Sequence, residues 1–210
     1  SLMKLENTDS SPYNPMINAG AIVVASCLAS EISFDTMLDT IRALCMDPDI
    51  NLDKKVYHSE MSHISRNRAI AYLLESKGYI EKNKDVENSL HFYVKMCSLS
   101  VTAESLAGLG LILANDGIHP DTGKRLLSSQ AVKIVKTLMF TCGMYDGSGE
   151  FAVRVGIPSK SGVGGGILSV VDGEMGIGIF GPALDKKGNS VAGECVLEYM
   201  SHELHLHMFD

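Results

Sequence analysis

A glycine-rich stretch that begins with a lysine, in the last third of the chain, has residue types suited to catalysis. Lys160, Ser161 and Gly162 precede a triple glycine at 164–166 and a β-prone run that starts near Ile167. Glycines let a substrate approach the backbone closely, and the free N–H groups of an edge strand can form an oxyanion hole. The stretch therefore predicts an edge strand that stabilises a developing negative charge, although a glycine-rich bulge in a sheet would have the same composition.

A Lys-[Ser/Thr]-Gly strand is also the third element of the serine β-lactamase and penicillin-binding fold. The first element there is Ser-x-x-Lys at the start of a buried helix, which places the lysine one turn on, where it activates the hydroxyl. The only Ser-x-x-Lys of this sequence is Ser1 to Lys4, which charged residues follow. We therefore do not expect Ser1 to be a nucleophile.

The segment Gly176 to Gly181 matches the GxGxxG pattern of dinucleotide-binding proteins. That pattern binds a pyrophosphate only where a strand leads into a helix. Here it lies inside a β-prone run and Pro182 follows it, so we interpret the glycines as sites of close strand packing.

Three histidines near the end of the chain, His202, His205 and His207, resemble a zinc signature. The metalloprotease pattern needs two histidines four residues apart on one helix, with a glutamate between them. The spacing here is three and then two, so we predict no metal site and interpret the segment as a solvated amphipathic helix.

The first two-thirds of the sequence predict a helical body, at about 15–142. Apolar residues at helical spacing and capping residues predict successive helices. Residues 47–61 are polar and are expected to be irregular. The helices are expected at 17–29, at 34–46 after Ser33, at 65–77 before Gly78, after Asp85, after Thr102 and after Ser128.

The last third predicts strands and a final helix, at about 150–208. Three short β-prone runs cover 151–156, 165–171 and 175–180, and the dipeptide Asp172-Gly173 is a strong hairpin signal. A helix over about 190–208 can then cover the sheet. The sequence predicts an α+β fold in one domain, with an antiparallel β-meander packed by a C-terminal helix.

Composition excludes several classes of protein. The chain has 210 residues, 45% of them hydrophobic, and a formal net charge of −7. The absence of basic clusters argues against a nucleic-acid partner, and no uninterrupted apolar run of the ~18 residues that span a membrane is present. The five cysteines include no CxxC pair, which argues against a zinc knuckle or a dithiol site. We expect a cytoplasmic protein, with a targeting segment ahead of Ser1 left open.

Several segments resemble the glutaminase family, in order from about residue 1 to 200. The most specific are Asn14-Pro-Met-Ile-Asn-Ala-Gly-Ala and Cys142-Gly-Met-Tyr-Asp. The resemblance implies the C-terminal two-thirds of a catalytic domain with a β-lactamase/transpeptidase-like fold whose N-terminal part is missing. The other similar segments are Ser59-Glu60, Arg66-Asn67, Phe92-Tyr93, Cys97-Ser98, Val101-Thr102, Leu113-Ala-Asn-Asp-Gly117 and Lys160-Ser-Gly-Val-Gly-Gly-Gly166.

The resemblance implies that six residues contact L-glutamine. Glutamine is a zwitterion with a side-chain amide, so its ammonium group needs a carboxylate, which Glu60 supplies. Asn18, Asn67 and Tyr93 supply donors to the α-carboxylate. Val163 contributes its backbone N–H. The full set is Asn18, Glu60, Asn67, Tyr93, Tyr145 and Val163, in one shared cavity.

Tyr145 is the predicted proton carrier. Its unperturbed pKa of about 10 means that it needs a neighbouring cation to act near neutral pH. The resemblance implies a serine acyl-enzyme that yields L-glutamate and ammonia without metal or cofactor, and association into homo-oligomers. In the family the nucleophilic serine precedes Asn14, so this chain is expected to be nearly inactive alone.

Two other hypotheses remain open at this point. The missing nucleophile favours a catalytically silent module or subunit that binds glutamine. The tripeptide Lys160-Ser161-Gly162 on its own would favour a penicillin-binding protein or a β-lactam hydrolase.

Overall fold

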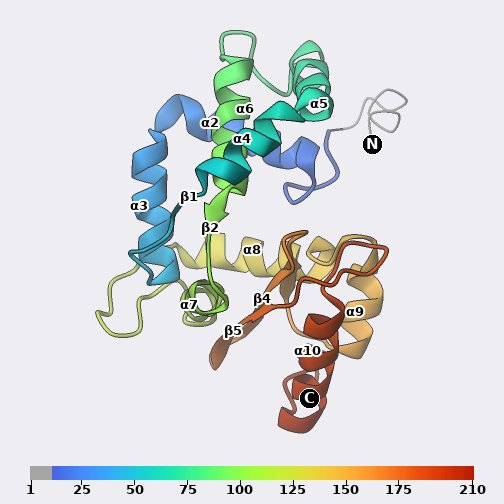
Figure 1. Cartoon of the computed structure of the whole chain (residues 1–210). Coiled ribbons are helices and arrows are strands. Elements are labelled where there is room, and N and C mark those ends of the chain that lie inside the picture. Colours follow the sequence, from blue (N-terminus) through green and yellow to red (C-terminus); the bar gives the residue numbers. More distant parts are fainter. Residues whose placement is uncertain (1–10) are drawn as a thin grey trace. The chain divides into compact units, whose positions relative to one another are not determined.

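The computed structural model describes residues 11–210, which form two compact units. The first contains the described part of Ser1–Thr40 together with Ile50–Ser100, and the second contains Ile41–Asp49 and Val101–Asp210. Figure 1 labels their elements. The Ser-x-x-Lys pair, Ser1 and Lys4, lies outside the described residues. The helices over 103–114 and 129–142 belong with the sheet in the second unit.

The first unit is mainly helical. Its two short strands pair antiparallel, with Asn51 opposite Ser100. Its elements are α2 (Asn18–Glu31), the first part of α3 (Phe34–Cys45), β1 (Asn51–Leu52), α4 (Lys54–Ser62), α5 (Ser65–Ser76), α6 (Val86–Cys97) and β2 (Leu99–Ser100).

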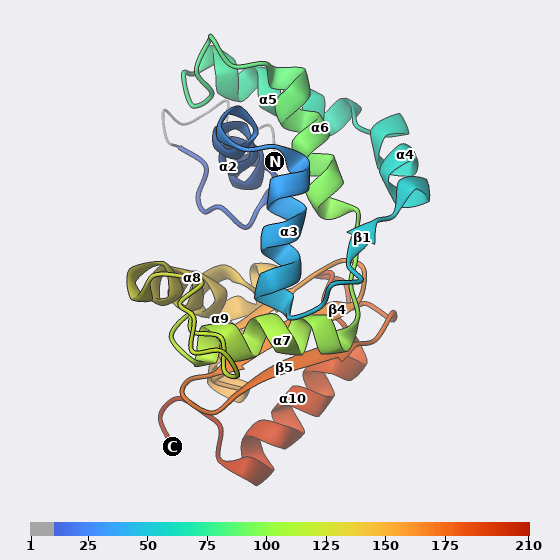
Figure 2. The same ribbon diagram turned by 90° about the vertical axis from the view of Figure 1, so that its left-hand side faces the viewer.

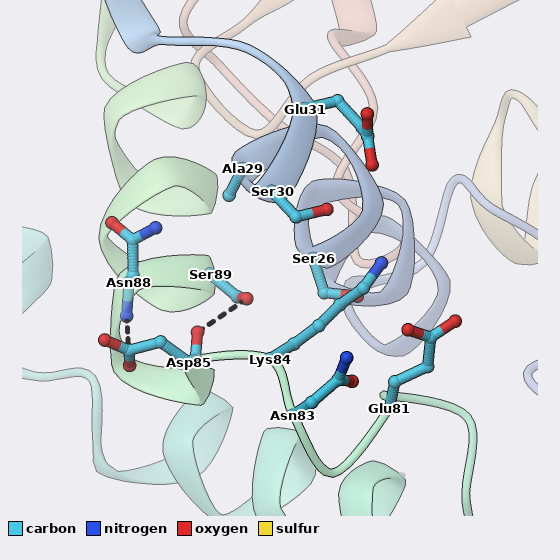
Figure 3. Close-up of a pocket in the computed structure, with 10 residues that line it drawn as sticks. All are labelled: Ser26, Ala29, Ser30, Glu31, Glu81, Asn83, Lys84, Asp85, Asn88 and Ser89. Carbon is cyan, nitrogen blue, oxygen red and sulfur yellow. Dashed lines mark hydrogen bonds between the residues drawn. The ribbon is translucent and has the colours of Figure 1, made fainter.

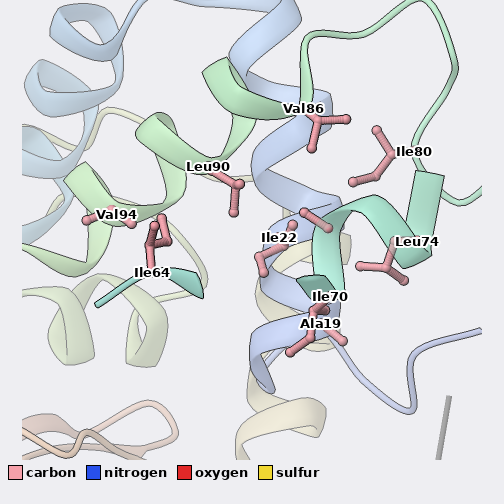
Figure 4. Packing of buried hydrophobic residues seen from close by; sticks show 10 residues of the cluster. Ala19, Ile22, Ile64, Ile70, Leu74, Ile80, Val86, Leu90 and Val94 are labelled. Carbon is pink, nitrogen blue, oxygen red and sulfur yellow. The ribbon is translucent and has the colours of Figure 1, made fainter. Parts of the chain in front are cut away.

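The core of the first unit lies among α2, α5 and α6 (Figure 4). Ile22, Leu74 and Leu90, one from each helix, are 0% exposed. The capping residues expected from the sequence are present here, because the Asp85 side chain accepts from Asn88 N and the Ser33 hydroxyl accepts from Thr36 N. The prediction of helices over 65–77 and after Asp85 is confirmed.

Helix α4 lies where the sequence predicted irregular structure over 47–61, so that prediction was wrong. The Asp53 carboxylate caps the helix by accepting from the N–H groups of Lys55 and Val56 at 2.8 and 3.1 Å. None of its residues is buried. Only Tyr57 and Met61, four residues apart and half-buried, pack against the core from this helix, so its hydrophobic periodicity is weak and its cap is the clearer sign in the sequence.

The second unit contains a three-stranded antiparallel sheet in the order β3-β4-β5, as the meander prediction required. The Asp172-Gly173 turn joins β4 and β5, with Val171 opposite Met175. Its elements are α7 (Ala103–Ala114), α8 (Ser129–Cys142), the 3₁₀ turn η1 (Tyr145–Gly147), α9 (Ser148–Arg154), β3 (Ser159–Ser161), β4 (Gly166–Val171), β5 (Met175–Phe180) and α10 (Val191–Leu204).

Two helices cover opposite faces of this sheet, α7 on one face and α10 on the other (Figures 1 and 2). On the α10 face, Leu197 joins Ile167 and Val171 in a buried cluster. On the α7 face the contact is close. A Cβ at Gly176 would lie 2.1 Å from Leu111 N, and one at Gly178 would lie 1.8 Å from Ala103 O. The GxGxxG glycines therefore serve strand–helix packing, as expected.

The segment 151–156, predicted to be a strand, is mostly helix α9, so that prediction was wrong. Phe151 and Val155, four residues apart, are 3% and 0% exposed, whereas Val153 between them is 79% exposed. The apolar alternation of the sequence suggested a strand, but only the residues at helical spacing are buried.

The final helix α10 is shorter than predicted because it ends at Leu204, followed by His205 in the left-handed conformation with φ 54°. His202 is therefore the only one of the three histidines on the helix. Between residues 11 and 210, no three His, Cys, Asp or Glu side chains are grouped so as to hold a metal ion. In that range no single helix is long and apolar enough to cross a membrane, although α2 and α3 pass by length and composition as a bent pair.

Candidate functional site

The Asn-Pro-Met-Ile-Asn-Ala-Gly segment places Asn18 at the first residue of α2. The Asn14 side chain accepts from Met16 N at 2.9 Å and from Ile17 N at 3.2 Å, which closes the turn before the helix. Gly20 permits that turn, because a Cβ there would lie 2.0 Å from the Asn14 carbonyl oxygen. The motif thus fixes where α2 begins.

Asn18 and Asn67 form a side-chain pair in the first unit. Asn18 Nδ2 donates to Asn67 Oδ1 at 3.0 Å, which links the starts of α2 and α5. Asn18 is exposed and Asn67 is half-buried. An amide pair held in this way has a fixed orientation and retains further donor and acceptor capacity for a ligand.

Glu60 and Tyr93 both interact with Cys97, also in the first unit. Desolvation raises the pKa of the Cys97 thiol, the hydrogen bond with the Tyr93 side chain lowers it, and the Glu60 charge raises it. The Tyr93 hydroxyl and the Glu60 carboxylate therefore lie near the same sulfur. Glu60 is exposed on α4 and Tyr93 is half-buried on α6. An exposed carboxylate is suited to pair with an ammonium group.

Tyr145 and Val163 form a second cluster, in the second unit. The Tyr145 oxygen is hydrogen-bonded to the backbone N–H of Val163, which lowers the pKa of the phenol, but burial raises that pKa more. Val163 is 72% exposed, and the group that it presents to the Tyr145 oxygen is its backbone N–H. At neutral pH Tyr145 is therefore a proton donor with its oxygen beside a main-chain N–H.

Lys160 is a cation that lies close to the Tyr145 ring. Its Nζ lies 4.8 Å from the centroid of the Tyr145 ring, within cation–π range. Burial lowers the pKa of Lys160, and the Cys142 thiol partly offsets this. The Lys160 ammonium also donates to the Ser161 carbonyl. The sequence called for a cation that would let Tyr145 act near neutral pH; Lys160 supplies a nearby cation, but the Tyr145 pKa stays raised because burial outweighs the other influences on it.

The backbone of Tyr145 is strained. Its φ of 53° lies in the left-handed region, where residues other than glycine and asparagine are uncommon. Such a conformation costs roughly 1–3 kcal/mol and tends to occur at functional sites.

The two motifs that carry Tyr145 and Val163 are bonded to each other. Ser161 N donates to the Gly143 carbonyl at 3.0 Å, and a Cβ at Gly143 would lie 1.9 Å from the Ser159 carbonyl oxygen. Gly165, with φ 94°, closes the loop around Val163 by donating to the Gly162 carbonyl at 2.8 Å. The backbone segments that carry Tyr145 and Val163 are therefore held next to each other by hydrogen bonding and close packing.

The structure places the six predicted residues in three small groups, each inside one unit. Asn18 touches Asn67, while Glu60 and Tyr93 share Cys97. The third group is the pair of Tyr145 and Val163. The contacts of Cys97 were not anticipated from the sequence, in which it is one of five scattered cysteines.

Two cavities are found in the described chain, and neither is lined by any of the six residues. One, of about 440 Å³, lies in the first unit between the end of α2 and the start of α6, and is lined by polar side chains such as Ser26, Lys84 and Asn88 (Figure 3). The other, of about 560 Å³, lies in the second unit against Phe140, His207 and neighbouring residues.

Comparison with known proteins shows a consistent relationship. The family model described as Glutaminase matches residues 1–209. A glutaminase of Clostridioides difficile is 52% identical over 213 residues, covering 100% of this chain and 68% of that protein. This chain thus spans about two-thirds of that relative's length.

Solved structures agree. The crystal structure of a probable glutaminase from Bacillus subtilis matches with a TM-score of 0.91 at 39% identity, covering 99% of this chain and 70% of that one. A Bacillus subtilis glutaminase in covalent complex with 5-oxo-L-norleucine, formed by reaction with 6-diazo-5-oxo-L-norleucine, matches with a TM-score of 0.88 at 40% identity, covering 94% and 70%. The predicted α+β, β-lactamase-like fold is confirmed, and the chain belongs to the glutaminase family.

Proposed function

We propose that the protein containing this chain hydrolyses the side-chain amide of L-glutamine to give L-glutamate and ammonia. The observation that carries the proposal is the Tyr145 hydroxyl, held beside the Val163 N–H with the Lys160 ammonium over its ring. The covalent ligand of the solved relative supports it, because 5-oxo-L-norleucine is an α-amino acid with a carbonyl where glutamine has its amide carbon.

In the first unit we assign recognition of the amino-acid end of glutamine. Glu60 pairs with the ammonium group, while Asn18, Asn67 and Tyr93 donate to the α-carboxylate. The support is that each is at least partly exposed, and that the Asn18–Asn67 hydrogen bond holds two amides in place. A charge-assisted hydrogen bond is worth about 1.5–3 kcal/mol, enough to select an amino acid over a plain amide.

In the second unit we assign the chemistry at the amide. A serine hydroxyl, on a Ser-x-x-Lys segment that precedes Asn14 in the family, gives its proton to the lysine of that segment and forms a bond to the amide carbon while the carbon–nitrogen bond breaks. The protonated Tyr145 gives its proton to the leaving nitrogen, which departs as ammonia, and Lys160 and the Val163 N–H stabilise the resulting phenolate. Water then attacks the glutamyl ester and gives one proton to the Tyr145 phenolate, while the lysine of the Ser-x-x-Lys segment returns its proton to the departing serine oxygen and glutamate is released.

The test is ammonia release from L-glutamine by the full-length gene product. Tyr145→Phe removes the transferable proton and is expected to lower kcat about 10²–10⁴-fold, the usual contribution of acid–base catalysis. Tyr199→Phe, on the exposed face of α10, is the matched control and should leave kcat unchanged. A full-length protein with a Ser-x-x-Lys segment that ignores glutamine would refute the proposal.

Glu60→Gln tests the recognition step separately. Removing the charge while keeping the shape is expected to weaken L-glutamate binding about 10–100-fold by calorimetry, because a charge-assisted pair is lost. Glu104→Gln, near the start of α7, makes the same charge change away from the assigned residues. Equal affinities for both variants would remove Glu60 from the site.

For these 210 residues alone we propose binding without turnover, since their only Ser-x-x-Lys is Ser1 to Lys4. Calorimetric titration of glutamine with a parallel ammonia assay decides this. Hydrolysis at the full-length rate would contradict it, and absence of both heat and turnover would contradict the binding half. A cytoplasmic location and a homo-oligomer remain predictions that fractionation and light scattering can test.

A further inference from the structure

A compact turn over residues 185–189 lies against the proposed proton carrier. The Asp185 carboxylate oxygen Oδ1 accepts from the backbone N–H groups of Lys187, Gly188 and Asn189 at 2.9, 2.8 and 2.9 Å. Asp185 N also donates to the Asn189 carbonyl at 2.8 Å. These bonds give the turn one well-defined shape, in which Gly188 has φ 100°.

The 185–189 turn contacts Tyr145 directly. A Cβ at Gly188 would lie 3.6 Å from Tyr145 Cε2 and 3.6 Å from Val163 Cγ1, so the glycine backbone lies beside both residues. Asn189, which is 0% exposed, donates from Nδ2 to the Met144 carbonyl at 3.2 Å. That carbonyl belongs to the peptide group that precedes the strained backbone of Tyr145.

Ser148 holds the same backbone from the other side. Its hydroxyl accepts from Met144 N at 3.0 Å and donates to the Tyr145 carbonyl at 2.8 Å. With the bond from Asn189, both carbonyls that flank the Tyr145 φ and ψ angles are held. A left-handed tyrosine persists only where its surroundings over-determine it, and these contacts do so.

Asn189 is a costly choice for this buried position. Its Oδ1 is buried and has no hydrogen-bond partner in the described chain. An apolar side chain of similar size would avoid that penalty. The benefit of an asparagine at this position is therefore its Nδ2 group, which donates to the Met144 carbonyl.

We infer that Asn189 is a positioning residue for the reaction, acting through the Met144 carbonyl to hold Tyr145 in its left-handed conformation beside Val163. The effect of Asn189 on catalysis rests on the function proposed above. The hydrogen bond from Asn189 to the Met144 carbonyl does not depend on that function, so the positioning role and the proposed function can be refuted separately.

The kinetic test compares Asn189→Leu with Asn115→Leu in the full-length protein. Asn115 Nδ2 makes the same kind of bond, to the Ile118 carbonyl at 2.9 Å, beyond the end of α7. Since a small misplacement of a catalytic group can cost about 10²-fold, we expect Asn189→Leu to lower kcat roughly 10–100-fold with KM within about 2-fold. The control should change neither constant. Where leucine prevents folding, Asn189→Ala takes its place.

A double-mutant cycle separates positioning from general destabilisation. In a Tyr145→Phe background, Asn189→Leu should lower kcat by less than about 2-fold, because residues that act through one another are not additive. If instead the kcat loss of the double variant equals the product of the two single losses, Asn189 acts independently of Tyr145, and the inference is overturned.

A spectroscopic test needs no activity. With tyrosines labelled with ¹³C at Cζ, the signal that disappears in Tyr145→Phe is that of Tyr145. Asn189→Leu should shift that signal and its titration, and leave the others in place. A parent that does not hydrolyse glutamine, together with a shifted signal, would refute the proposed function alone. An active parent whose Asn189 variant keeps both kcat and the Tyr145 signal would refute the positioning role.

Discussion

At the scale of single residues, several glycines mark places where two backbones touch. Gly20 meets the Asn14 carbonyl, Gly143 meets the Ser159 carbonyl and Gly178 meets the Ala103 carbonyl, each closer than a Cβ allows. Because the obstructing atoms are backbone, they cannot turn aside as a flexible side chain can. The glycines of the family motifs therefore determine where Asn18 and Tyr145 are placed without contacting a ligand.

The first prediction concerns Gly178. Gly178→Ala inserts a methyl group 1.8 Å from the Ala103 carbonyl oxygen, and is expected to lower the free energy of unfolding by about 1–3 kcal/mol, the usual cost of overpacking. Urea titration measures this. Gly149→Ala is the control, because no atom lies within 4 Å of its added Cβ in α9, and it should be neutral or stabilise by up to about 1 kcal/mol. Equal losses would show that the packing argument is wrong.

At the scale of elements, capping side chains decide where several helices begin. Thr102 and Ser105 form a capping box at α7, and Ser105 also donates to Asp47 at 2.6 Å. Asp53 begins α4, the helix with Glu60. Since α4 buries none of its residues fully and only Tyr57 and Met61 pack against the core, its cap is expected to matter for its stability.

The second prediction follows for α4. Asp53→Ala removes the acceptor for two N–H groups and is expected to cost about 0.5–2 kcal/mol of helix stability. Amide hydrogen exchange within α4 should quicken several-fold, and L-glutamate should bind more weakly. Asp53→Asn keeps an acceptor at the cap and should behave nearly as the parent. Unchanged exchange in Asp53→Ala would contradict the role of the cap.

At the scale of the whole molecule, carboxylates in both units are more acidic than usual. The Arg68 guanidinium holds the pKa of Glu87 below its ordinary value, and the Asn189 N–H is the largest cause of the lowered pKa of Asp185. A carboxyl whose pKa is lower in the folded state adds stability above its unfolded pKa of about 4, and this is lost as pH falls through the folded value.

The third prediction is therefore an acid-sensitive stability. The free energy of unfolding should fall as pH is lowered from about 5 to 3. Arg68→Gln should make that fall smaller, because Glu87 loses the partner that lowers its pKa. Arg66→Gln, with the same charge change two residues earlier on α5, should leave the slope unchanged. Identical slopes for both variants would exclude the Arg68–Glu87 pair as a source.

The sequence was informative where local chemistry decides the structure. Caps at Ser33, Asp85, Thr102 and Ser128 marked helix starts, and Asp172-Gly173 marked the hairpin. It failed for α4, where only Tyr57 and Met61 face the core, and for α9, where the exposed Val153 gave the sequence a strand-like alternation.

For the site, the motifs gave the candidate residues but few of their contacts. The bond from Asn189 to Met144 spans 45 positions, and no short pattern encodes it. The position of Cys97 between Glu60 and Tyr93 likewise depends on how α4 and α6 pack. The six assigned roles stay predictions that the variants above can test.

The left-handed backbone of Tyr145 costs stability at a residue that we propose to act in catalysis, so thermal stability and turnover conflict at this position. Glycine or asparagine there would relieve the strain, so a screen that rewards only survival at high temperature should enrich Tyr145→Gly or Tyr145→Asn. Given the role proposed for Tyr145, we expect such variants to be more heat-stable but inactive. Improving this protein by selection thus requires that every round also demand ammonia production.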